Sequence, residues 1–298
     1  MHIDIGGRKV GDGQPCYVVA EIGLNHNGDI AIARELIRAA KEAGADAVKF
    51  QKRTIDLCYT KAELHAPRES PWGTTNRQQK EGLELSKGQY LLIDDYCNEI
   101  EMPWFASCWD IPSVDFIELF DPPCYKIASA SLTDKALLEH TARKSKPILL
   151  STGMSTTEEI SIAENLICRQ WCGRSWMPGN PLVLMHCTST YPSKTEELNL
   201  RCIPSFRKLG LVGYSGHEVG LQTTLAAVAL GACVVERHIT LNRSMYGSDQ
   251  AASIEPHGFK QMVRDIREIE KAMGDGVKRV YDSELPIKAK LRKVETLV

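Results

Sequence analysis

Residues 16–51 read C-Y-V-V-A-E-I-G-L-N-H-N-G-D-I-A-I-A-R-E-L-I-R-A-A-K-E-A-G-A-D-A-V-K-F-Q, and this stretch decides the fold class. Its start, 16–23, is a short apolar run that predicts a buried strand, and 29–44 carries apolar residues at helical spacing. Asp29 suits the N-cap of that helix, and Gly44 suits its C-cap. A second apolar run closes the stretch. These features predict two parallel strands joined by a right-handed helical crossover.

The same alternation of apolar runs and amphipathic stretches continues along the chain. Eight strands with eight helical connections favour a closed parallel barrel, the (β/α)8 or TIM barrel. The turn after the first strand lacks the G-x-G-x-x-G pattern of an open, doubly wound sheet. We predict a single α/β barrel domain over residues 1–275, a tail over 276–298, and a long loop over 52–85. The six further strands are expected at 103–107, 124–129, 147–152, 181–188, 211–215 and 232–240, and further helices at 156–167, 221–231 and 256–274.

The composition is that of an ordinary globular protein, with 43% hydrophobic residues among 298 and a formal net charge of -2. This balance argues against a nucleic-acid-binding surface, and no run has the length of a membrane span or the pattern of a secretory leader. The ten cysteines form no C-x-x-C pair, and many lie in apolar runs, so we expect reduced, buried thiols. We therefore predict a cytoplasmic protein with no nucleic-acid or membrane partner.

Polar side chains lie where the predicted strands end, and this end is the active-site face of a TIM barrel. Lys49 lies near the end of the second strand, and Lys126 lies near the end of the fourth. A single lysine in an apolar strand usually extends outward to solvent, but two at the same end of a barrel make a positive pocket. Neutral donors beside them favour a phosphate or phosphorylated carboxylate ligand. These donors are Ser129, Ser151 and Ser215.

Histidines and glutamates lie at the same face. His217 and His238 follow neighbouring strands, so they are either ligands of a shared divalent metal or separate hydrogen-bonded histidines, and spacing alone does not decide. Glu21 is either a carboxylate held by backbone donors or a general base. Glu236 shares a strand face with His238 and could orient it. We interpret His186 as a structural histidine.

Seven stretches, in order from about residue 15 to about residue 275, resemble the barrel domain of the sialic acid synthase (N-acetylneuraminate synthase) family. The resemblance implies a transferase that condenses phosphoenolpyruvate with the open-chain aldehyde of a sugar, often an N-acetylated hexosamine. The products would be phosphate and a nonulosonic acid that is three carbons longer than the sugar. The stretches are A-E-I-G-L-N-H-N-G-D (20–29), A-G-A-D-A-V-K-F-Q (43–51), Y-K-I-A-S (125–129), K-P-I-L-L-S-T-G-M-S (146–155), H-C-T-S-T-Y-P (186–192), G-Y-S-G-H (213–217) and E-R-H-I-T (236–240).

The resemblance also implies roles for individual residues. Glu21 matches the acid/base carboxylate and, with His238, makes up the catalytic assignment. His217 and His238 match the metal ligands, with Mn²⁺ as the expected ion and Mg²⁺ or Co²⁺ as alternatives. The positions that match phosphoenolpyruvate ligands are Lys49, Lys126, Ser129, Ser151 and Ser215. The positions that match the surroundings of the sugar are Gln51, Tyr191 and Asp249.

Several positions depart from the family pattern. Ser107 is followed by Cys-Trp where the family usually has S-T-P, and Ser189 stands where H-C-T-N has Asn. We keep both serines as substrate-binding candidates. Gly216 stands where the family often has Asp, and S-G-E reads S-A-S at 129–131. The match is therefore better for phosphoenolpyruvate than for the sugar, for which Trp72 in the long loop is a further candidate.

Alternatives remain open. Family members usually carry a C-terminal antifreeze-like domain, which is not seen up to Val298; we still expect a homodimer of barrels. A synthase for a phosphorylated aldose would need an extra basic cluster, which the long loop could supply through Arg53, Arg68 and Arg77. A Schiff-base aldolase using Lys126 is another enzymatic reading. A non-catalytic sugar-binding barrel is the reading outside enzymes, and the presence of the acid/base, lysine and histidine residues argues against it.

Overall fold

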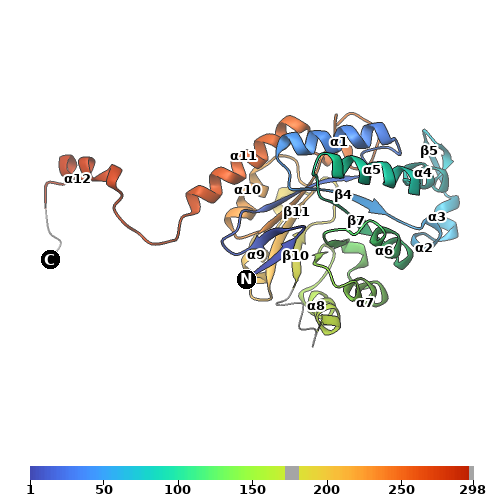
Figure 1. Ribbon diagram of the computed structural model, residues 1–298, viewed down its shortest axis with the longest axis horizontal. Coiled ribbons are helices and arrows are strands. Elements are labelled where there is room, and N and C mark those ends of the chain that lie inside the picture. The colour runs from blue at the N-terminus through green and yellow to red at the C-terminus, as the bar shows by residue number, and fades with distance from the viewer. Residues whose placement is uncertain (172–180, 295–298) are drawn as a thin grey trace.

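A closed barrel of eight parallel strands forms the centre of the computed structural model, which describes residues 1–171 and 181–294 (Figure 1). The last strand pairs with the first and so closes the barrel, with Glu21 beside His238. The predicted (β/α)8 barrel is confirmed. In order around the barrel the strands are β3 (Tyr17–Gly23), β4 (Ala47–Lys52), β7 (Trp104–Cys108), β8 (Tyr125–Ile127), β9 (Ile148–Ser151), β10 (Leu182–Cys187), β11 (Leu211–Gly216) and β12 (Val234–His238).

Helices surround the barrel and pack on the outward-facing side chains of its strands. Asp29 caps the first helix by accepting from the amide of Ala31, and Gly44 ends it in the left-handed region at φ 86°, as predicted. Apolar residues bury one face of each main helix, for example Phe259 and Ile266 of α11. The main helices are α1 (Ile30–Ala43), α5 (Lys87–Glu99), α6 (Ile111–Glu118), α7 (Lys135–Arg143), α8 (Thr157–Trp171), α9 (Cys202–Phe206), α10 (Gln222–Ala229) and α11 (Pro256–Met273).

A hairpin that our sequence analysis missed closes the amino end of the barrel. Strands β1 (His2–Ile5) and β2 (Arg8–Gly11) pair antiparallel and are joined by two glycines with positive φ. Ile5 and Val10 of this hairpin are fully buried and belong to the same apolar cluster as the inward-facing side chains at the start of the barrel strands. The hairpin therefore completes the inner core at the end of the barrel opposite to the expected site.

The predicted long loop 52–85 is in fact folded. It contains α2 (Ile55–Cys58), α3 (Lys61–His65), the hairpin β5 (Pro67–Ser70) and β6 (Gly73–Thr75), and α4 (Asn76–Leu83). Capping boxes begin α3 and α4. The ring of Trp72 rests on Gly82, where a Cβ atom would come within 2.1 Å of it, and contacts the ring of Tyr246 edge-on. Trp72 thus anchors the hairpin rather than lining the pocket described below.

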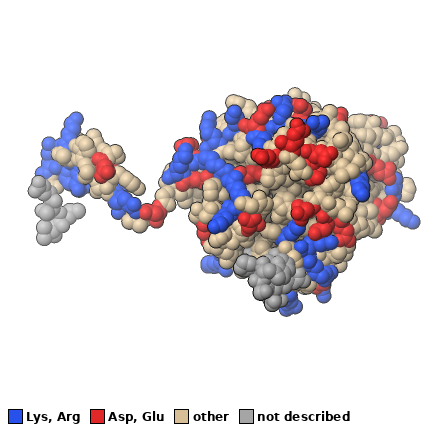
Figure 2. Space-filling model, viewed as in Figure 1, with Lys and Arg blue, Asp and Glu red and all other residues tan. Residues whose placement is uncertain are grey.

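Beyond α11 the described chain leaves the barrel. All residues from 271 to 294 are exposed, and this segment with its short helix α12 (Leu285–Leu291) extends away from the body (Figure 1). Positive and negative side chains are interspersed over the face shown in Figure 2. Among the described residues, no helix has the length and apolar character needed to cross a bilayer. Eight of the described cysteines are free thiols, namely Cys16, Cys58, Cys97, Cys108, Cys124, Cys187, Cys202 and Cys233, and Cys172 lies outside the described residues.

Candidate active site

A pocket of about 190 Å³ lies at the carboxyl ends of the barrel strands. Twelve of the thirteen predicted site residues line it, and Asp249 does not. Trp109 and Met154 also line the pocket and were not among the expected site residues, and Glu236 lines it as its place at this strand end predicted. The predicted residues that line the pocket are Glu21, Lys49, Gln51, Ser107, Lys126, Ser129, Ser151, Ser189, Tyr191, Ser215, His217 and His238.

Strand register brings these side chains together. Lys49 on β4 lies beside Glu21 on β3, which in turn lies beside His238 on β12. Ser107 on β7 is likewise the neighbour of Lys126 on β8. Since alternate residues of a strand face the same side, the neighbours in each row all point into the barrel. Residues far apart in sequence therefore form continuous rows across the mouth of the barrel.

Two buried lysines and two buried glutamates form the centre of the pocket. Lys49 Nζ lies 2.6 Å from Glu21 Oε2 and 3.6 Å from Glu236 Oε1, and it donates to Ser107 Oγ at 2.9 Å. Lys126 Nζ lies 3.8 Å from the same Glu236 oxygen. Glu236 thus lies close to both lysines. It also accepts a hydrogen bond from the hydroxyl of a serine of β11, which lines the pocket. Our expectation that Glu236 orients His238 is not supported, because no hydrogen bond joins these two described residues.

The pKa values of the two glutamates are shifted in opposite directions. Burial raises the pKa of Glu21, and the nearby Lys49 only partly offsets this effect. Burial alone would also raise the pKa of Glu236, but Lys126 and Lys49 together hold it below the usual range. A pair of carboxyl groups separated in this way is typical of acid/base sites, in which one group exchanges a proton and the other keeps its charge.

His217 and His238 form the second part of the pocket. Their ring centres are 5.6 Å apart, and the ring of Tyr191 lies 4.0 Å from that of His217. His217 Nδ1 donates to the carbonyl oxygen of Thr188 at 2.8 Å, which leaves Nε2 with a free lone pair. His238 Nδ1 is buried and has no hydrogen-bond partner among the described residues.

These two histidines fit the ligation of a divalent metal. Burial lowers the pKa of both rings, so each is neutral at pH 7, which is the form that binds a metal. The described residues contain no cluster of three or more histidine, cysteine or carboxylate groups arranged around a metal. An ion held here would therefore take its remaining ligands from water or substrate, as in an open site.

Small hydroxyl groups converge at another side of the pocket. Ser129 Oγ accepts from the amide of Gly153 at 3.1 Å and lies 3.2 Å from the sulfur of Cys187. A Cβ atom at Gly153 would come 2.2 Å from Ser189 Oγ, so only glycine leaves these hydroxyls in place. The cluster offers neutral donors, which suits the oxygen atoms of an anionic ligand.

The remaining predicted residues lie around this centre. Asp249 begins a 3-10 turn after β12, and its negative charge is close enough to His238 to oppose the effect of burial on the pKa of that ring. Tyr191 is half exposed at the mouth of the pocket. His186 donates from Nε2 to the carbonyl oxygen of Leu198, as a structural histidine does.

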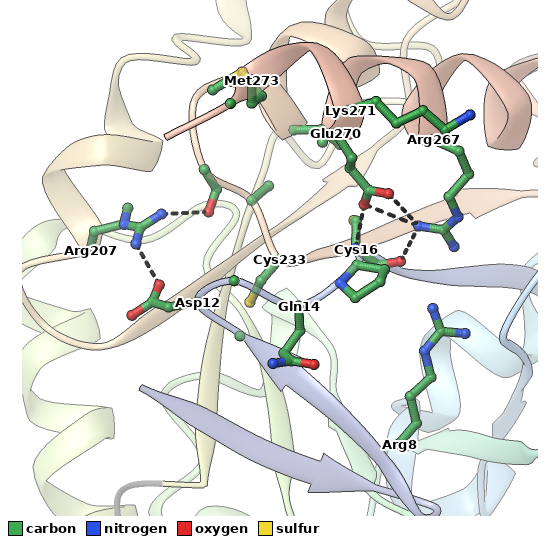
Figure 3. Close-up of a pocket in the computed structure, with 17 residues that line it drawn as sticks. Arg8, Asp12, Gln14, Cys16, Arg207, Cys233, Arg267, Glu270, Lys271 and Met273 are labelled. Carbon is green, nitrogen blue, oxygen red and sulfur yellow. Dashed lines mark hydrogen bonds and ion pairs between the residues drawn. The ribbon is translucent and has the colours of Figure 1, made fainter. Parts of the chain in front are cut away.

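A larger hollow of about 710 Å³ lies at the opposite end of the barrel, near the amino-terminal hairpin (Figure 3). Its basic side chains are engaged locally: Arg207 pairs with Asp12, and Arg267 contacts Glu270 and the carbonyl oxygen of Cys16. It holds neither the buried lysines nor the histidines. The smaller pocket is therefore the candidate active site, at the end of the barrel where TIM-barrel enzymes carry their chemistry.

Comparison with known proteins identifies the family of this chain. The sequence model of the NeuB family matches residues 36–278, which is most of the chain. The chain belongs to the NeuB family. The family predicted from sequence is thereby confirmed, and this NeuB-family protein is an enzyme of the sialic-acid-synthase type.

Similar proteins are named as synthases of different acids. Mouse N-acetylneuraminate-9-phosphate synthase is 39% identical over 293 residues, covering 96% of this chain and 79% of its own length. N,N'-diacetyllegionaminic acid synthase of Legionella pneumophila is 37% identical, covering 96% of this chain and 81% of its own length. The crystal structure of N-acetylneuraminic acid synthetase from Leptospira borgpetersenii, in complex with citrate, superposes with a TM-score of 0.84 at 28% identity, covering 99% of this chain and 98% of that one.

Proposed function

We propose that this NeuB-family protein condenses phosphoenolpyruvate with the open-chain aldehyde of an N-acetylhexosamine-like sugar, giving a nonulosonic acid and phosphate. The proposal rests on one observation above all: two buried lysines and two buried glutamates share a pocket with two neutral histidines. Lys49 and Lys126 supply positive charge for the carboxylate and phosphate of phosphoenolpyruvate. The hydroxyls of Ser129, Ser151, Ser189 and Ser215 supply neutral donors around them.

The reaction balances with water as the third reactant. The methylene carbon of phosphoenolpyruvate bonds to the aldehyde carbon, and the aldehyde oxygen takes up a proton. Water adds to the former enol carbon, and phosphate leaves by cleavage of its C–O bond. Glu21 has the raised pKa that suits a group holding and exchanging a proton near neutral pH, while Glu236 stays charged and fixes the lysines.

His217 and His238 are proposed as the protein ligands of a divalent ion, with Mn²⁺ as the best candidate and Mg²⁺ or Co²⁺ as alternatives. When bound, the ion would supply Lewis-acid polarisation of the aldehyde oxygen. Gln51 and Tyr191 line the pocket on this side and are proposed to orient the sugar. Asp249 does not line the pocket, but its negative charge acts to raise the pKa of His238, and we propose that it also contributes to the surroundings of the sugar.

A second candidate acceptor is the sugar 6-phosphate. The mouse relative is named for a 9-phosphate product, and since condensation adds three carbons, that phosphate corresponds to carbon 6 of an acceptor. Beside the pocket, the guanidinium carbon of Arg53 lies 5.8 Å from the Trp109 ring, and its Nη2 is buried without a hydrogen-bond partner among the described residues. Arg53 Nη1 donates to the hydroxyl of Tyr59, and Lys80 Nζ lies 5.2 Å from the centre of that ring.

These cations are candidates for a distal phosphate site. Burial first, and then the positive charges of Arg53 and Arg68, lower the pKa of Lys80, while Asp249 and Glu84 oppose this shift. Glu84 also pairs with Arg53, whose Nε lies 2.6 Å from Glu84 Oε1. Arg77 is not part of this group, because it pairs with Asp56 and Glu81.

Phosphate release tests both candidates. The enzyme would be assayed with phosphoenolpyruvate, Mn²⁺ and a panel of N-acetylhexosamines, their 6-phosphates and unacetylated aldoses. We expect turnover with one of the first two groups. If the 6-phosphate is the acceptor, Lys80→Met should lower kcat/KM for it and leave the unphosphorylated sugar unaffected. Phosphate release with none of the panel would contradict the proposed function.

A further inference from the structure

A fully buried ion pair lies behind the two histidines of the pocket, on the outer side of β11 and β12. Arg237 Nη1 lies 2.8 Å from Glu218 Oε1, and the two side chains are 0% and 1% exposed. Glu218 directly follows His217 in the sequence, and Arg237 directly precedes His238. Because side chains alternate along a strand, Arg237 faces away from the pocket while His238 faces into it.

The ion pair is part of a hydrogen-bonded network that joins two strands and a helix. The Glu218 carboxylate accepts from the hydroxyls of Tyr214 at 2.9 Å, Thr223 at 2.7 Å and Thr224 at 3.0 Å. Arg237 Nη2 also donates to the main-chain oxygen of Glu218 at 2.6 Å. One set of polar contacts therefore holds together four parts of the chain: β11, the residue after His217, the start of α10, and β12.

Gly216 keeps the space that this network occupies. A Cβ atom at this position would come 2.5 Å from Glu218 Oε2, 2.9 Å from Arg237 Cδ and 2.7 Å from the Tyr214 ring. The requirement for glycine comes from these contacts, since its φ lies outside the left-handed region. The residue before His217 is thus small because a carboxylate and a guanidinium must fit directly beside it.

We propose that Glu218 and Arg237 are positioning residues, whose ion pair fixes the separation and orientation of His217 and His238. The inference rests on the proposed function, in which these histidines hold a metal. A buried ion pair contributes little net stability compared with well-packed apolar residues, so stability does not account for it. Its rigid geometry does have a use at this place, because metal ligands must be held within about 0.5 Å of their working positions.

The test is a double variant, Glu218→Gln with Arg237→Met, which removes both charges without leaving one buried alone. Titration calorimetry should show that Mn²⁺ affinity falls by about tenfold or more, as for other groups that orient metal ligands. Phosphoenolpyruvate affinity should stay within about twofold, because the lysines are on other strands. Ile266→Ala on α11 is the matched control: it lowers stability in the core and should leave Mn²⁺ affinity unchanged. A double variant that loses stability but binds Mn²⁺ as the wild type does would overturn the proposal.

A second readout needs no metal. In metal-free crystal structures, the His217–His238 ring separation, 5.6 Å in the wild-type chain, should change by more than about 0.5 Å in the double variant. Unchanged ring positions would overturn the positioning role. If the wild-type enzyme binds no divalent ion, the metal assignment fails, and the crystal comparison still decides the role of the ion pair. If the double variant does not fold, Tyr214→Phe replaces it, because this change removes only one hydrogen bond to Glu218. The Mn²⁺ affinity of Tyr214→Phe should be about fivefold lower than that of the wild type.

Discussion

At the scale of single residues, Lys126 is the clearest test of phosphoenolpyruvate binding. Its ammonium group is buried, and burial followed by the nearby Lys49 lowers its pKa although Glu236 opposes this. An anionic ligand bound here would supply a negative charge that stabilises the protonated ammonium group of Lys126. Removing a hydrogen bond to a charged group costs about 1.5–3 kcal/mol, so Lys126→Met should weaken phosphoenolpyruvate binding by about tenfold or more. Calorimetry measures this, with the exposed Lys135→Met as control. Equal affinity in both variants would remove the assignment.

The histidines give a second prediction at this scale. Treatment with EDTA should abolish turnover, and Mn²⁺ should restore it, because His217 and His238 are the proposed metal ligands. His238→Ala should also abolish turnover while leaving phosphoenolpyruvate affinity largely intact, since the lysines hold that ligand. Phosphate release and calorimetry give the two readouts. Full activity of an enzyme shown by metal analysis to be stripped would contradict the proposed metal role.

Much of the pocket could be predicted from sequence because strand alternation is a strong rule. It placed Lys49 and Lys126 at one end of the barrel, and the register confirms that they share it. Alternation identifies the face of a residue but not its nearest neighbour on the next strand. Alternation therefore suggests that Glu236 could orient His238, whereas the structure shows its carboxylate near both lysines. Asp249 lies beyond the strand, where no such periodicity applies.

At the scale of elements, the amino-terminal hairpin shows what the sequence analysis overlooked. Its sequence, I-D-I-G-G-R-K-V, does carry a signal: apolar and polar residues alternate around Gly6-Gly7, a typical two-residue hairpin turn. The loop 52–85 was misread for a related reason. Its elements are short, with helices of four to eight residues, so helical periodicity could not reveal them, whereas the capping boxes at Thr60 and Thr75 could have.

The hairpin should contribute substantially to stability because it completes the inner core. Ile5 is fully buried among side chains of the barrel interior. Ile5→Ala removes apolar contacts and leaves a cavity, so the free energy of unfolding should fall by about 2–5 kcal/mol. Urea unfolding measures the change. Ile162→Ala, at an exposed position of α8, should alter stability by less than about 0.5 kcal/mol. An equally small change for Ile5→Ala would show that the hairpin is not part of the core.

Asp110 gives an element-scale prediction about pH. It caps α6 by accepting from the amide of Ser113, and it accepts from the amide and hydroxyl of Thr54 after β4. Burial would raise the pKa of Asp110, but these hydrogen bonds outweigh it and hold the pKa below its usual value. A depressed pKa stabilises the folded state above the unfolded pKa, and the contribution is lost as pH falls through the folded pKa.

Both carboxylate oxygens of Asp110 accept hydrogen bonds and an asparagine has only one such oxygen, so Asp110→Asn should lower stability at pH 7 by about 1 kcal/mol and have a smaller effect below the usual aspartate pKa. Unfolding by urea at pH 7 and at the lowest pH where the protein stays folded measures both values. Asp95→Asn, at an exposed position of α5, is the control. A difference between Asp110→Asn and wild type that is the same at both pH values would contradict the electrostatic origin of the effect.

At the scale of the whole molecule, the barrel could be predicted because its helices and strands alternate regularly, whereas contacts between copies of the chain leave no such pattern. The segment beyond α11 carries large apolar side chains in the open, among them Val277, Ile287 and Leu291 at 55–68% exposure. Exposed apolar groups gathered on a projecting segment favour burial against another surface. The expected homodimer gives these side chains a place to pack.

Light scattering at micromolar concentration should accordingly give twice the 33.2 kDa mass of one chain. A variant that ends at Gly274 keeps the complete barrel and lacks these exposed apolar side chains, so it should be monomeric if they make the contact. Its phosphoenolpyruvate affinity should match that of the full chain, since every residue of the pocket lies before the truncation. That comparison separates loss of association from loss of folding. A monomeric full-length chain would contradict the homodimer, and a dimeric truncated chain would place the contact on the barrel itself.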